Sequence, residues 1–227
     1  MAPLTKQVTV LEDGAVFSLA VTRKGVGPIQ TKFGNFWQYD FLINDQWEKY
    51  SVLVKATIDP KSFQPVLRNK TLPLRIDSGC ETGQVFHDLT CECGEQLAKT
   101  MRFIARSGEG IIVHIPKQDG RGMGLPFKLA TLWAQKALQL DTIEAASVLT
   151  PDGMIDKRTY LGVVCILKFF GIKKTVKINL ATNNPSKNNV FIDNGYALSK
   201  NIPVKIRANK YTRVHLLSKK KHLGHKL

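Results

Sequence analysis

Three of the four cysteines lie close together in the chain with the spacing C-x10-C-x-C, namely Cys80, Cys91 and Cys93. Thiols grouped in this way, in a chain that begins without an apolar export signal, favour metal binding over disulfide bonds, with zinc as the expected metal. A structural zinc site has four protein ligands, whereas a catalytic site has three and leaves the fourth position to water, so this cluster favours a catalytic site. The spacing alone also allows buried core cysteines, or a structural site completed by His87 or His114.

A second group of residues is suited to binding phosphate. Segment 117–126, KQDGRGMGLP, contains three glycines and Arg121, and it joins a short apolar strand to a helix expected over residues 127–140. Small residues let backbone N–H groups approach phosphate oxygens, and a helix N-terminus favours anions. The pattern is not a standard phosphate-binding motif, so an ordinary surface turn is the alternative interpretation.

Two further loops bring charged residues to the ends of strands. Asp156 and Arg158 follow a Pro-Asp-Gly turn at 151–153 and precede an apolar helix expected over residues 160–170. Lys187 follows the turn 182–185, TNNP, which should lead into a short helix. In alternating strand and helix architectures such loops gather at one edge of the sheet. We therefore expect them to form one pocket with the cysteine segment.

The elements that must position these residues indicate an α/β fold with a β-rich N-terminal part. Residues 8–56 are rich in strand-forming side chains and turn at Asp13-Gly14 and Asn44-Asp45, which predicts antiparallel sheet. The run after Cys93 predicts a helix that ends at Gly108, and Cys165 falls in an apolar helix and is expected in the core. Strands are also expected over residues 111–115, 175–182 and 203–207.

Composition and charge limit the class of protein. The net charge of +15 and the pI near 9.8 indicate a polyanionic partner such as nucleic acid, an anionic surface or a triphosphate. No apolar run reaches the roughly 18 residues of a membrane span, so we expect a cytoplasmic enzyme or binding protein. The expected organisation is a β-rich region 1–58, a zinc-binding catalytic region 59–210 and a basic C-terminal tail 211–227.

Several motifs occur together, and in order, in one known family. The cysteine spacing is followed by G-x-Q-L, and four further segments resemble Q-E-G-R-G-I-G-L, D-T-V-E-A, D-x-R-x-Y and T-N-N-P-x-K. In this chain the five segments stand at residues 94–97, 118–125, 141–145, 156–160 and 182–187. The chain from about Thr31 to its C-terminus thus resembles GTP cyclohydrolase II, the family that opens riboflavin biosynthesis.

The resemblance implies a zinc hydrolase acting on GTP or a related purine nucleotide. In that family three thiolates hold zinc, a bound water attacks C8 of the guanine ring, and formate and pyrophosphate leave, with magnesium commonly on the phosphates. The family is usually dimeric, which implies a homodimer. Asp156 is then the catalytic base, and Arg158 stabilises charge in the transition state because a guanidinium stays protonated. The residues that the resemblance places at the substrate are Arg75, Ile76, Asp77, Ser78, Gly79, Gln96, Asp119, Gly120, Arg121, Thr142, Thr182 and Lys187.

The chain departs from the family pattern near the cysteines. Asp77 stands where the family has histidine, Gly79 where it has glutamate, and Gln84 where it has aspartate. Ile115 stands at the position of a tyrosine whose hydroxyl assists the ring chemistry, and isoleucine neither donates nor accepts a proton. Three alternatives are therefore open: a variant enzyme that stops at the formamidopyrimidine, a hydrolase of another heterocycle, and a non-catalytic zinc protein that binds nucleotide or, less favoured, nucleic acid.

Overall fold

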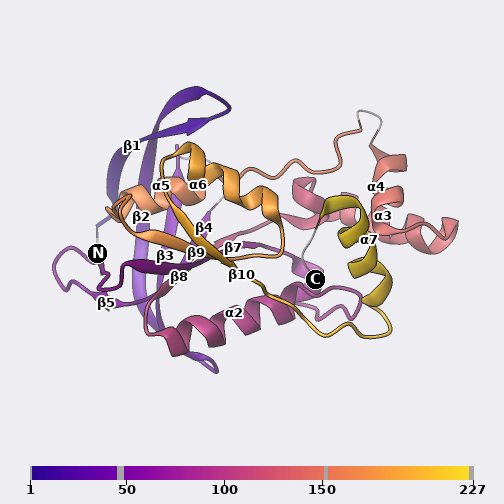
Figure 1. The fold of residues 1–227 in the computed structure, drawn as a ribbon, viewed down its shortest axis with the longest axis horizontal. Coiled ribbons are helices and arrows are strands. Elements are labelled where there is room, and N and C mark those ends of the chain that lie inside the picture. Colours follow the sequence, from indigo (N-terminus) through magenta and orange to yellow (C-terminus); the bar gives the residue numbers. More distant parts are fainter. Residues whose placement is uncertain (1, 45–48, 151–152, 225–227) are drawn as a thin grey trace.

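One curled sheet of eight strands forms the centre of the molecule (Figure 1). The computed structural model describes residues 2–44, 49–150 and 153–224. The strand order is β1-β2-β3-β4-β8-β7-β9-β10; neighbours from β1 to β8 pair antiparallel, and those from β8 to β10 pair parallel. The strands of this sheet are β1 (Leu4–Glu12), β2 (Ala15–Thr31), β3 (Gly34–Ile43), β4 (Tyr50–Lys55), β7 (Thr71–Ser78), β8 (Gly110–Ile115), β9 (Lys177–Ala181) and β10 (Leu198–Ile202). Strands β5 (Thr57–Ile58) and β6 (Pro65–Val66) form a small separate pair.

The helices alternate with the parallel strands in the second half of the chain, as the sequence predicts. They are α1 (Glu81–Gln84), α2 (Cys93–Ser107), α3 (Leu125–Leu138), α4 (Thr142–Leu149), α5 (Leu161–Phe169), α6 (Asn189–Asp193) and α7 (Arg213–Leu223), with the short 3-10 helices η1 (Asp119–Gly122) and η2 (Pro185–Asn188). Helix α2 ends at Gly108, which has a left-handed φ of 76°. The mixed α/β class with a β-rich N-terminal part is confirmed.

The predicted antiparallel N-terminal sheet is confirmed in the hairpin of β1 and β2. Asp13 and Gly14 have φ values of 49° and 80°, the conformation of a two-residue turn that matches strand twist. On the outer edge of β1, the side chain of Asn194 accepts from the backbone N of Leu11 and donates to its O, at 2.9 and 2.8 Å. This contact satisfies part of an edge that would otherwise present unpaired backbone groups.

Helices cover both faces of the sheet. Helix α5 is buried along nearly its whole length in the main core, where Cys165 is fully buried, as predicted. On the other face, Met101 and Ile104 of α2 pack against Phe36 and Ile112 of the sheet. Figure 1 shows α5 and α6 on one side of the strands and α2 on the other. The strand ends are thereby held between two packed layers.

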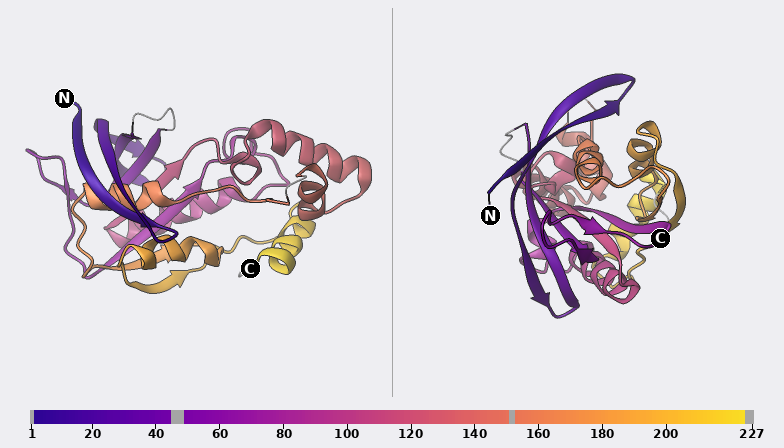
Figure 2. Two further views of the ribbon diagram at one scale, coloured as in Figure 1. Left: turned by 90° about the horizontal axis from the view of Figure 1, so that it is seen from above. Right: turned by 90° about the vertical axis from the view of Figure 1, so that its left-hand side faces the viewer.

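Helices α3, α4 and α7 form a group at one end of the molecule (Figures 1 and 2). Helix α3 follows η1, which lies beyond the carboxyl end of β8, and it packs against α4. Helix α7 packs against α4 in turn, so the basic segment expected as a C-terminal tail contains a docked helix. This group stands over the end of the sheet from which the predicted site loops emerge.

One predicted strand is wrong. Residues 203–207 are not a strand; β10 ends at Ile202, because Pro203 has no N–H with which to continue the ladder. The backbone of Val204 instead exchanges two hydrogen bonds with the side chain of Asn183. The turns predicted at 44–45 and 151–153 involve residues outside the described ranges. None of the described helices is both long and apolar enough to cross a membrane.

Candidate metal centre and nucleotide cavity

The three predicted cysteine ligands lie together at the carboxyl end of β7. Cys80 follows this strand, and Cys91 and Cys93 stand where the next loop enters α2. Their Sγ atoms lie within 4.8 Å of one another, and those of Cys80 and Cys91 are 3.5 Å apart. Two sulfurs on one tetrahedral zinc ion are about 3.8 Å apart, given a Zn–S bond of about 2.3 Å. The donor set and its spacing therefore fit zinc.

Neither histidine considered as a fourth ligand belongs to this cluster. His114 Nδ1 donates to Asp77 Oδ2 at 2.8 Å, and His87 is exposed in the loop between α1 and α2. Among the described residues, the group of close donor atoms consists of the three cysteines alone. A tetrahedral ion held by these sulfurs takes its fourth ligand from another source, which is the arrangement of catalytic zinc sites.

Lys128 of α3 contacts the cysteine cluster directly. Its Nζ donates to Cys80 Sγ at 2.8 Å and to Thr82 Oγ1, and it lies 3.7 Å from Asp119 Oδ1. Burial alone would lower the pKa of Lys128, but the sulfurs of Cys91 and Cys80 outweigh burial and raise it. Lys128 therefore carries its charge at neutral pH and faces the sulfur atoms of the cysteine cluster.

The glycine loop after β8 places Arg121 against the start of α4. Gly120 and Arg121 have φ values of 57° and 58° inside η1, a left-handed conformation that costs free energy in a residue other than glycine. Arg121 Nη2 donates to Thr142 Oγ1 at 3.2 Å and to Thr142 O at 3.3 Å. The backbone N of Lys157 donates to Arg121 O at 3.0 Å, which ties this loop to the segment that carries the predicted catalytic pair.

Asp156 and Arg158 form a close ion pair. The Nε and backbone N of Arg158 donate to Asp156 Oδ1 at 2.8 and 3.2 Å, and Nη2 donates to Oδ2. Burial alone would raise the pKa of Asp156, but the hydrogen bonds and charge of Arg158 lower it. The same pairing raises the pKa of Arg158 against its own burial. The carboxylate is thus ionised at neutral pH, and it fixes the orientation of the guanidinium.

Side chains from these segments line one cavity of about 490 Å³, a volume within the range of roughly 300–1,000 Å³ typical of small-molecule sites. The predicted site residues that line it are Ser78, Cys80, Cys91, Cys93, Asp119, Gly120, Arg121, Thr142 and Arg158. The predicted residues outside this lining are Arg75, Ile76, Asp77, Gly79, Gln96, Asp156, Thr182 and Lys187. The expectation that the cysteine loop, the glycine loop and the segment before α5 meet in one pocket is confirmed, whereas the loop after β9 lies behind it.

A buried polar network lies behind the cysteine cluster. Asp77, 1% exposed, accepts hydrogen bonds from Arg75 at 3.2 Å, from Gln84 at 2.8 Å and from His114 at 2.8 Å. Burial alone would raise the pKa of Asp77, but His114 and Arg75 outweigh it and lower the pKa to about 2. Gln84 Oε1 in turn accepts from the backbone N of Cys80 at 3.1 Å. The departures at positions 77 and 84 therefore belong to one network that holds the first predicted ligand.

Lys187 of η2 reaches the back of the cavity wall. Its Nζ donates to Ile76 O at 3.0 Å and to Ser78 Oγ at 3.2 Å, and Ser78 itself lines the cavity. Burial lowers the pKa of Lys187 well below its usual value, and the positive charges of Arg75 and Arg158 lower it further. A bound anion near Ser78 would relieve this accumulation of buried positive charge.

The two departures at positions 79 and 115 have a common structural setting. The backbone N of Gly79 donates to Ile115 O at 2.7 Å, and a Cβ on Gly79 would lie 2.7 Å from that oxygen and 2.9 Å from Pro116 Cα. A glutamate at position 79 would therefore require the backbone to shift. Ile115 is 1% exposed in the main core and is not part of the cavity lining.

Several cavity residues were not predicted from the sequence. The lining also includes Phe127, Lys128, Gln135 and Lys136 of α3, and Tyr211 of the C-terminal segment. A signal for Phe127 and Lys128 was present, because a helix that starts directly after a phosphate-type loop turns its first residues towards that loop, whereas Gln135 and Lys136 near the other end of α3 had none. Tyr211 had no such signal, because its position in the cavity wall depends on how the segment after β10 folds back onto the rest of the molecule.

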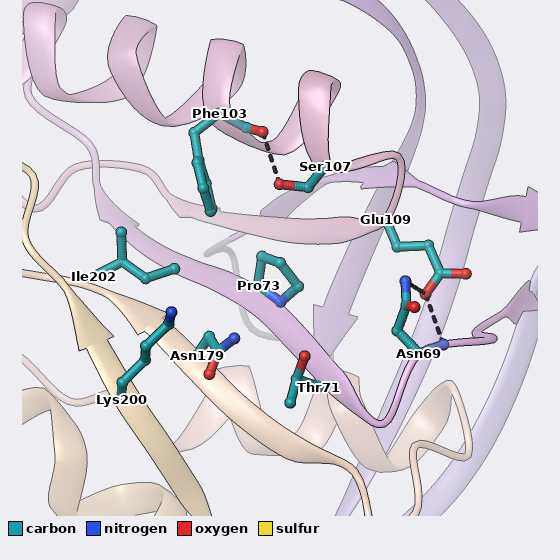
Figure 3. Close-up of a pocket in the computed structure, with 9 residues that line it drawn as sticks. All are labelled: Asn69, Thr71, Pro73, Phe103, Ser107, Glu109, Asn179, Lys200 and Ile202. Atoms are coloured by element: carbon teal, nitrogen blue, oxygen red, sulfur yellow. Dashed lines mark hydrogen bonds between the residues drawn. The ribbon is translucent and has the colours of Figure 1, made fainter.

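A second pocket, of about 310 Å³, lies between α2 and strands β7, β9 and β10 (Figure 3). Thr71 and Pro73 stand at the amino end of β7, the end opposite to the cysteines. The carboxylate of Glu109 is engaged by the side chain of Asn69 at 2.8 Å and the backbone N of Arg68 at 2.9 Å. Ligands of parallel sheets bind at the carboxyl ends of the strands, so the cysteine-lined cavity is the candidate site.

Fold and site together define a mixed α/β protein in which three cysteines that could hold a metal ion open into a cation-lined cavity. The chain belongs to the GTP cyclohydrolase II family, whose profile matches residues 23–203. It is 32% identical to a GTP cyclohydrolase-2 of Picrophilus torridus, with 87% of this chain and 94% of that protein covered. The corresponding enzyme of Streptomyces coelicolor is 30% identical over 99% of this chain and 95% of its own length. The suspected family resemblance is confirmed.

Longer relatives match as well. The riboflavin biosynthesis protein RibBA of Staphylococcus saprophyticus is 36% identical, with 86% of this chain and 45% of that protein covered. The chain thus spans about half the length of the RibBA relatives. A solved structure of a two-domain 3,4-dihydroxy-2-butanone 4-phosphate synthase from A. baumannii aligns with 83% of this chain and 40% of that chain, at a TM-score of 0.40 and 16% identity.

Proposed function

We propose that this chain hydrolyses the imidazole ring of GTP, opening it at C8 and releasing pyrophosphate, in riboflavin biosynthesis. The names of its GTP cyclohydrolase-2 and RibBA relatives support this reaction and this pathway. The proposal includes one zinc ion on Cys80, Cys91 and Cys93, and magnesium on the triphosphate. When bound, zinc supplies a Lewis acid that lowers the pKa of a water ligand towards neutrality.

The observation that carries the proposal is that the cysteine cluster, with Lys128 against it, shares its cavity with three further cationic side chains: Arg121, Lys136 and Arg158. A nucleoside triphosphate needs positive charge at one end of its site and the reacting centre at the other. The cavity volume of about 490 Å³ suits a ligand of this size. A site that only bound metal would have no need of these cations.

Arg158 and Asp156 act as a unit in this proposal. Arg158 stays protonated, so it binds phosphate oxygens and stabilises the charge that develops as pyrophosphate leaves. Asp156 holds the guanidinium through both oxygens and is ionised, so it can also accept a proton during ring opening. Arg121, held by Thr142, binds the phosphates from the opposite loop.

The buried cations behind the cavity wall support phosphate binding near Ser78. Arg75 and Lys187 are 7% and 6% exposed, and Lys187 contacts Ser78. Their carboxylate neighbour Asp77 is already shared with His114. Triphosphate binding on this side would place negative charge near Arg75 and Lys187, which would favour the protonated form of the lysine against the cost of its burial.

A second candidate is a variant that stops at the ring-opened formamide and retains C8. It is favoured by the burial of Ile115 at the position of the family tyrosine, because no hydroxyl from that position reaches the cavity. Ring opening needs one hydrolysis, and formate release needs a second. A missing proton donor would affect formate release, whereas ring opening would still be supported by Asp156.

We also propose a cytoplasmic homodimer. GTP is available there, and the thiols that bind zinc stay reduced in that compartment. Exposed apolar side chains flank the site: Val85, Phe86 and Leu89 in the loop after α1, and Trp133 on α3. Such a group is a candidate for a contact with a second copy. Sedimentation of the purified chain, and of a Trp133→Lys variant, tests this point.

One assay separates the candidate reactions. Zinc-loaded protein is incubated with GTP and magnesium, and pyrophosphate, formate and the ultraviolet spectrum are followed together. All three change for the complete reaction, whereas the formamide variant gives ring opening without formate. The Asp156→Asn variant should keep its zinc and lose about a hundredfold in kcat. Wild-type protein that binds GTP and leaves its spectrum unchanged would refute the hydrolase proposal.

A further inference from the structure

The C-terminal segment contributes one aromatic side chain to the cavity wall. The family profile ends at residue 203, and the chain continues for a further strap of residues 204–212 before helix α7 begins. Tyr211 in this strap lines the same cavity as Cys91 and Arg158. Its side chain is 47% exposed, so the ring is accessible to a ligand. The cavity wall is thus completed by a residue that lies beyond the part of the chain matched by the family profile.

The strap is fixed at both ends. The backbone N and O of Val204 are hydrogen bonded to the side chain of Asn183, at 2.8 and 2.9 Å. Before α7, Asn209 Oδ1 accepts from the backbone N of Tyr211 at 2.7 Å and from that of Thr212 at 2.8 Å. The backbone of Tyr211 is therefore held in one conformation at the beginning of a helix.

Helix α7 is in turn held against the turn that carries a predicted substrate residue. Leu216 of α7 is buried, and His222 Nε2 lies 3.5 Å from Asp141 Oδ2. Asp141 caps α4, and the next residue, Thr142, positions Arg121. The placement of Tyr211 is thus linked through α7 to the same structural unit that holds the phosphate-binding arginine.

The cavity lining has an aromatic part and a cationic part. Apart from the cysteines, its large apolar side chains are Phe127, Leu132 and Tyr211, and the two aromatic rings among them come from opposite segments. One face of the Tyr211 ring is covered by Lys210, whose Nζ lies 4.8 Å from the ring centroid. A flat heterocycle gains by stacking on an aromatic ring, whereas phosphate groups do not.

We propose that Tyr211 is a specificity-determining residue that stacks on the purine ring of the bound nucleotide. The inference rests on the proposed function, since it assigns the base of that substrate to the aromatic part of the cavity and the phosphates to its cations. Tyr211 does not take part in bond breaking. It selects a flat bicyclic base and holds it beside the cysteine cluster.

The test compares Tyr211→Ala, Tyr211→Phe and the control Leu217→Ala, whose side chain is 57% exposed on α7 and is not part of the cavity lining. Turnover of GTP is measured in each zinc-loaded protein. Affinities for GTP and for inorganic tripolyphosphate are measured by calorimetry with the same changes placed in the Asp156→Asn background. Tripolyphosphate carries the charge of the substrate without its base, so it reports on folding and on the cationic sites.

Tyr211→Ala is expected to weaken GTP binding and raise KM about tenfold, near the lower end of what base stacking on an aromatic ring contributes, with kcat changed less than about twofold. Tripolyphosphate affinity stays at its original value, and Tyr211→Phe and Leu217→Ala behave like the parent protein. Equal loss of GTP and tripolyphosphate affinity, or unchanged GTP affinity in Tyr211→Ala, overturns the inference. Wild-type protein that binds GTP without turnover refutes the hydrolase proposal alone, and protein that binds tripolyphosphate but not GTP refutes both.

Discussion

The ammonium group of Lys128 lies 2.8 Å from the sulfur of Cys80, and both side chains line the same cavity. In the proposed zinc site, three thiolates around one divalent cation would leave a net negative charge, and the lysine would offset it from α3, an element that supplies no cysteine. Hydrogen bonds to a ligand sulfur also fix its orientation. A helix that follows the glycine loop therefore contacts the cysteine cluster of a different loop.

Replacing Lys128 should weaken metal binding. Lys128→Met removes the charge and the hydrogen bond, and zinc affinity should fall by about tenfold, as is typical of lost outer-sphere partners. Competition with a chromogenic chelator measures this affinity without reference to activity. Lys136→Met is the matched control, because it removes a cavity lysine from the same helix. Equal affinities for wild type and Lys128→Met would contradict the assigned role.

The cysteines differ in their expected response to substitution. Cys91→Ser should reduce zinc content from one ion per chain to near zero and abolish ring opening, because two thiolates and a hydroxyl bind zinc poorly. Cys165→Ala is the control, because that side chain is buried in α5 away from the cluster. It should keep full zinc content at some cost in stability. Elemental analysis of the purified variants decides between these outcomes.

Stability should fall in acid in a way that depends on Asp77. The pKa of this carboxyl is about 2 in the folded protein, below its usual value of 3.8. Its ionised form therefore stabilises the fold above about pH 4, by roughly 2 kcal/mol, and this stabilisation is lost as the pH falls towards 2. In Asp77→Asn the free energy of unfolding in urea should be lower at pH 7, and its decline between pH 4 and pH 2 should be shallower. Parallel pH curves for the two proteins would refute this assignment.

Gly79 should not tolerate a side chain. A Cβ at this position would lie 2.7 Å from the backbone oxygen of Ile115, and backbone atoms cannot move aside cheaply. We expect Gly79→Ala to lower the melting temperature by several degrees, and Gly79→Glu, which restores the family residue, to lower it at least as much. Gly27→Ala in β2 is the control, because an added Cβ there has no neighbour within 4 Å. Thermal unfolding followed by circular dichroism provides the comparison.

Local chemistry explains how much of the site was predictable. The short interval between Cys91 and Cys93 brings these two residues together in almost any loop, whereas the position of Cys80 beside them depends on how the loop after β7 folds. The strand, glycine loop and helix around Arg121 likewise place its backbone at a sheet edge by chain connectivity. The strand expected at 203–207 was wrong, because Pro203 has no N–H with which to continue the ladder beyond Ile202.

Contacts between segments that lie far apart in the chain were decided only by the tertiary structure. Sequence alone identified Asp77, Gln84 and His114 as unusual or unassigned residues, but their hydrogen-bonded network depends on the register of β7 against β8. Tyr211 reaches the cavity because Asn183 holds the chain at Val204 and α7 docks on α4. Local residue patterns carry no information about such packing, because its free energy is gained only when remote surfaces meet.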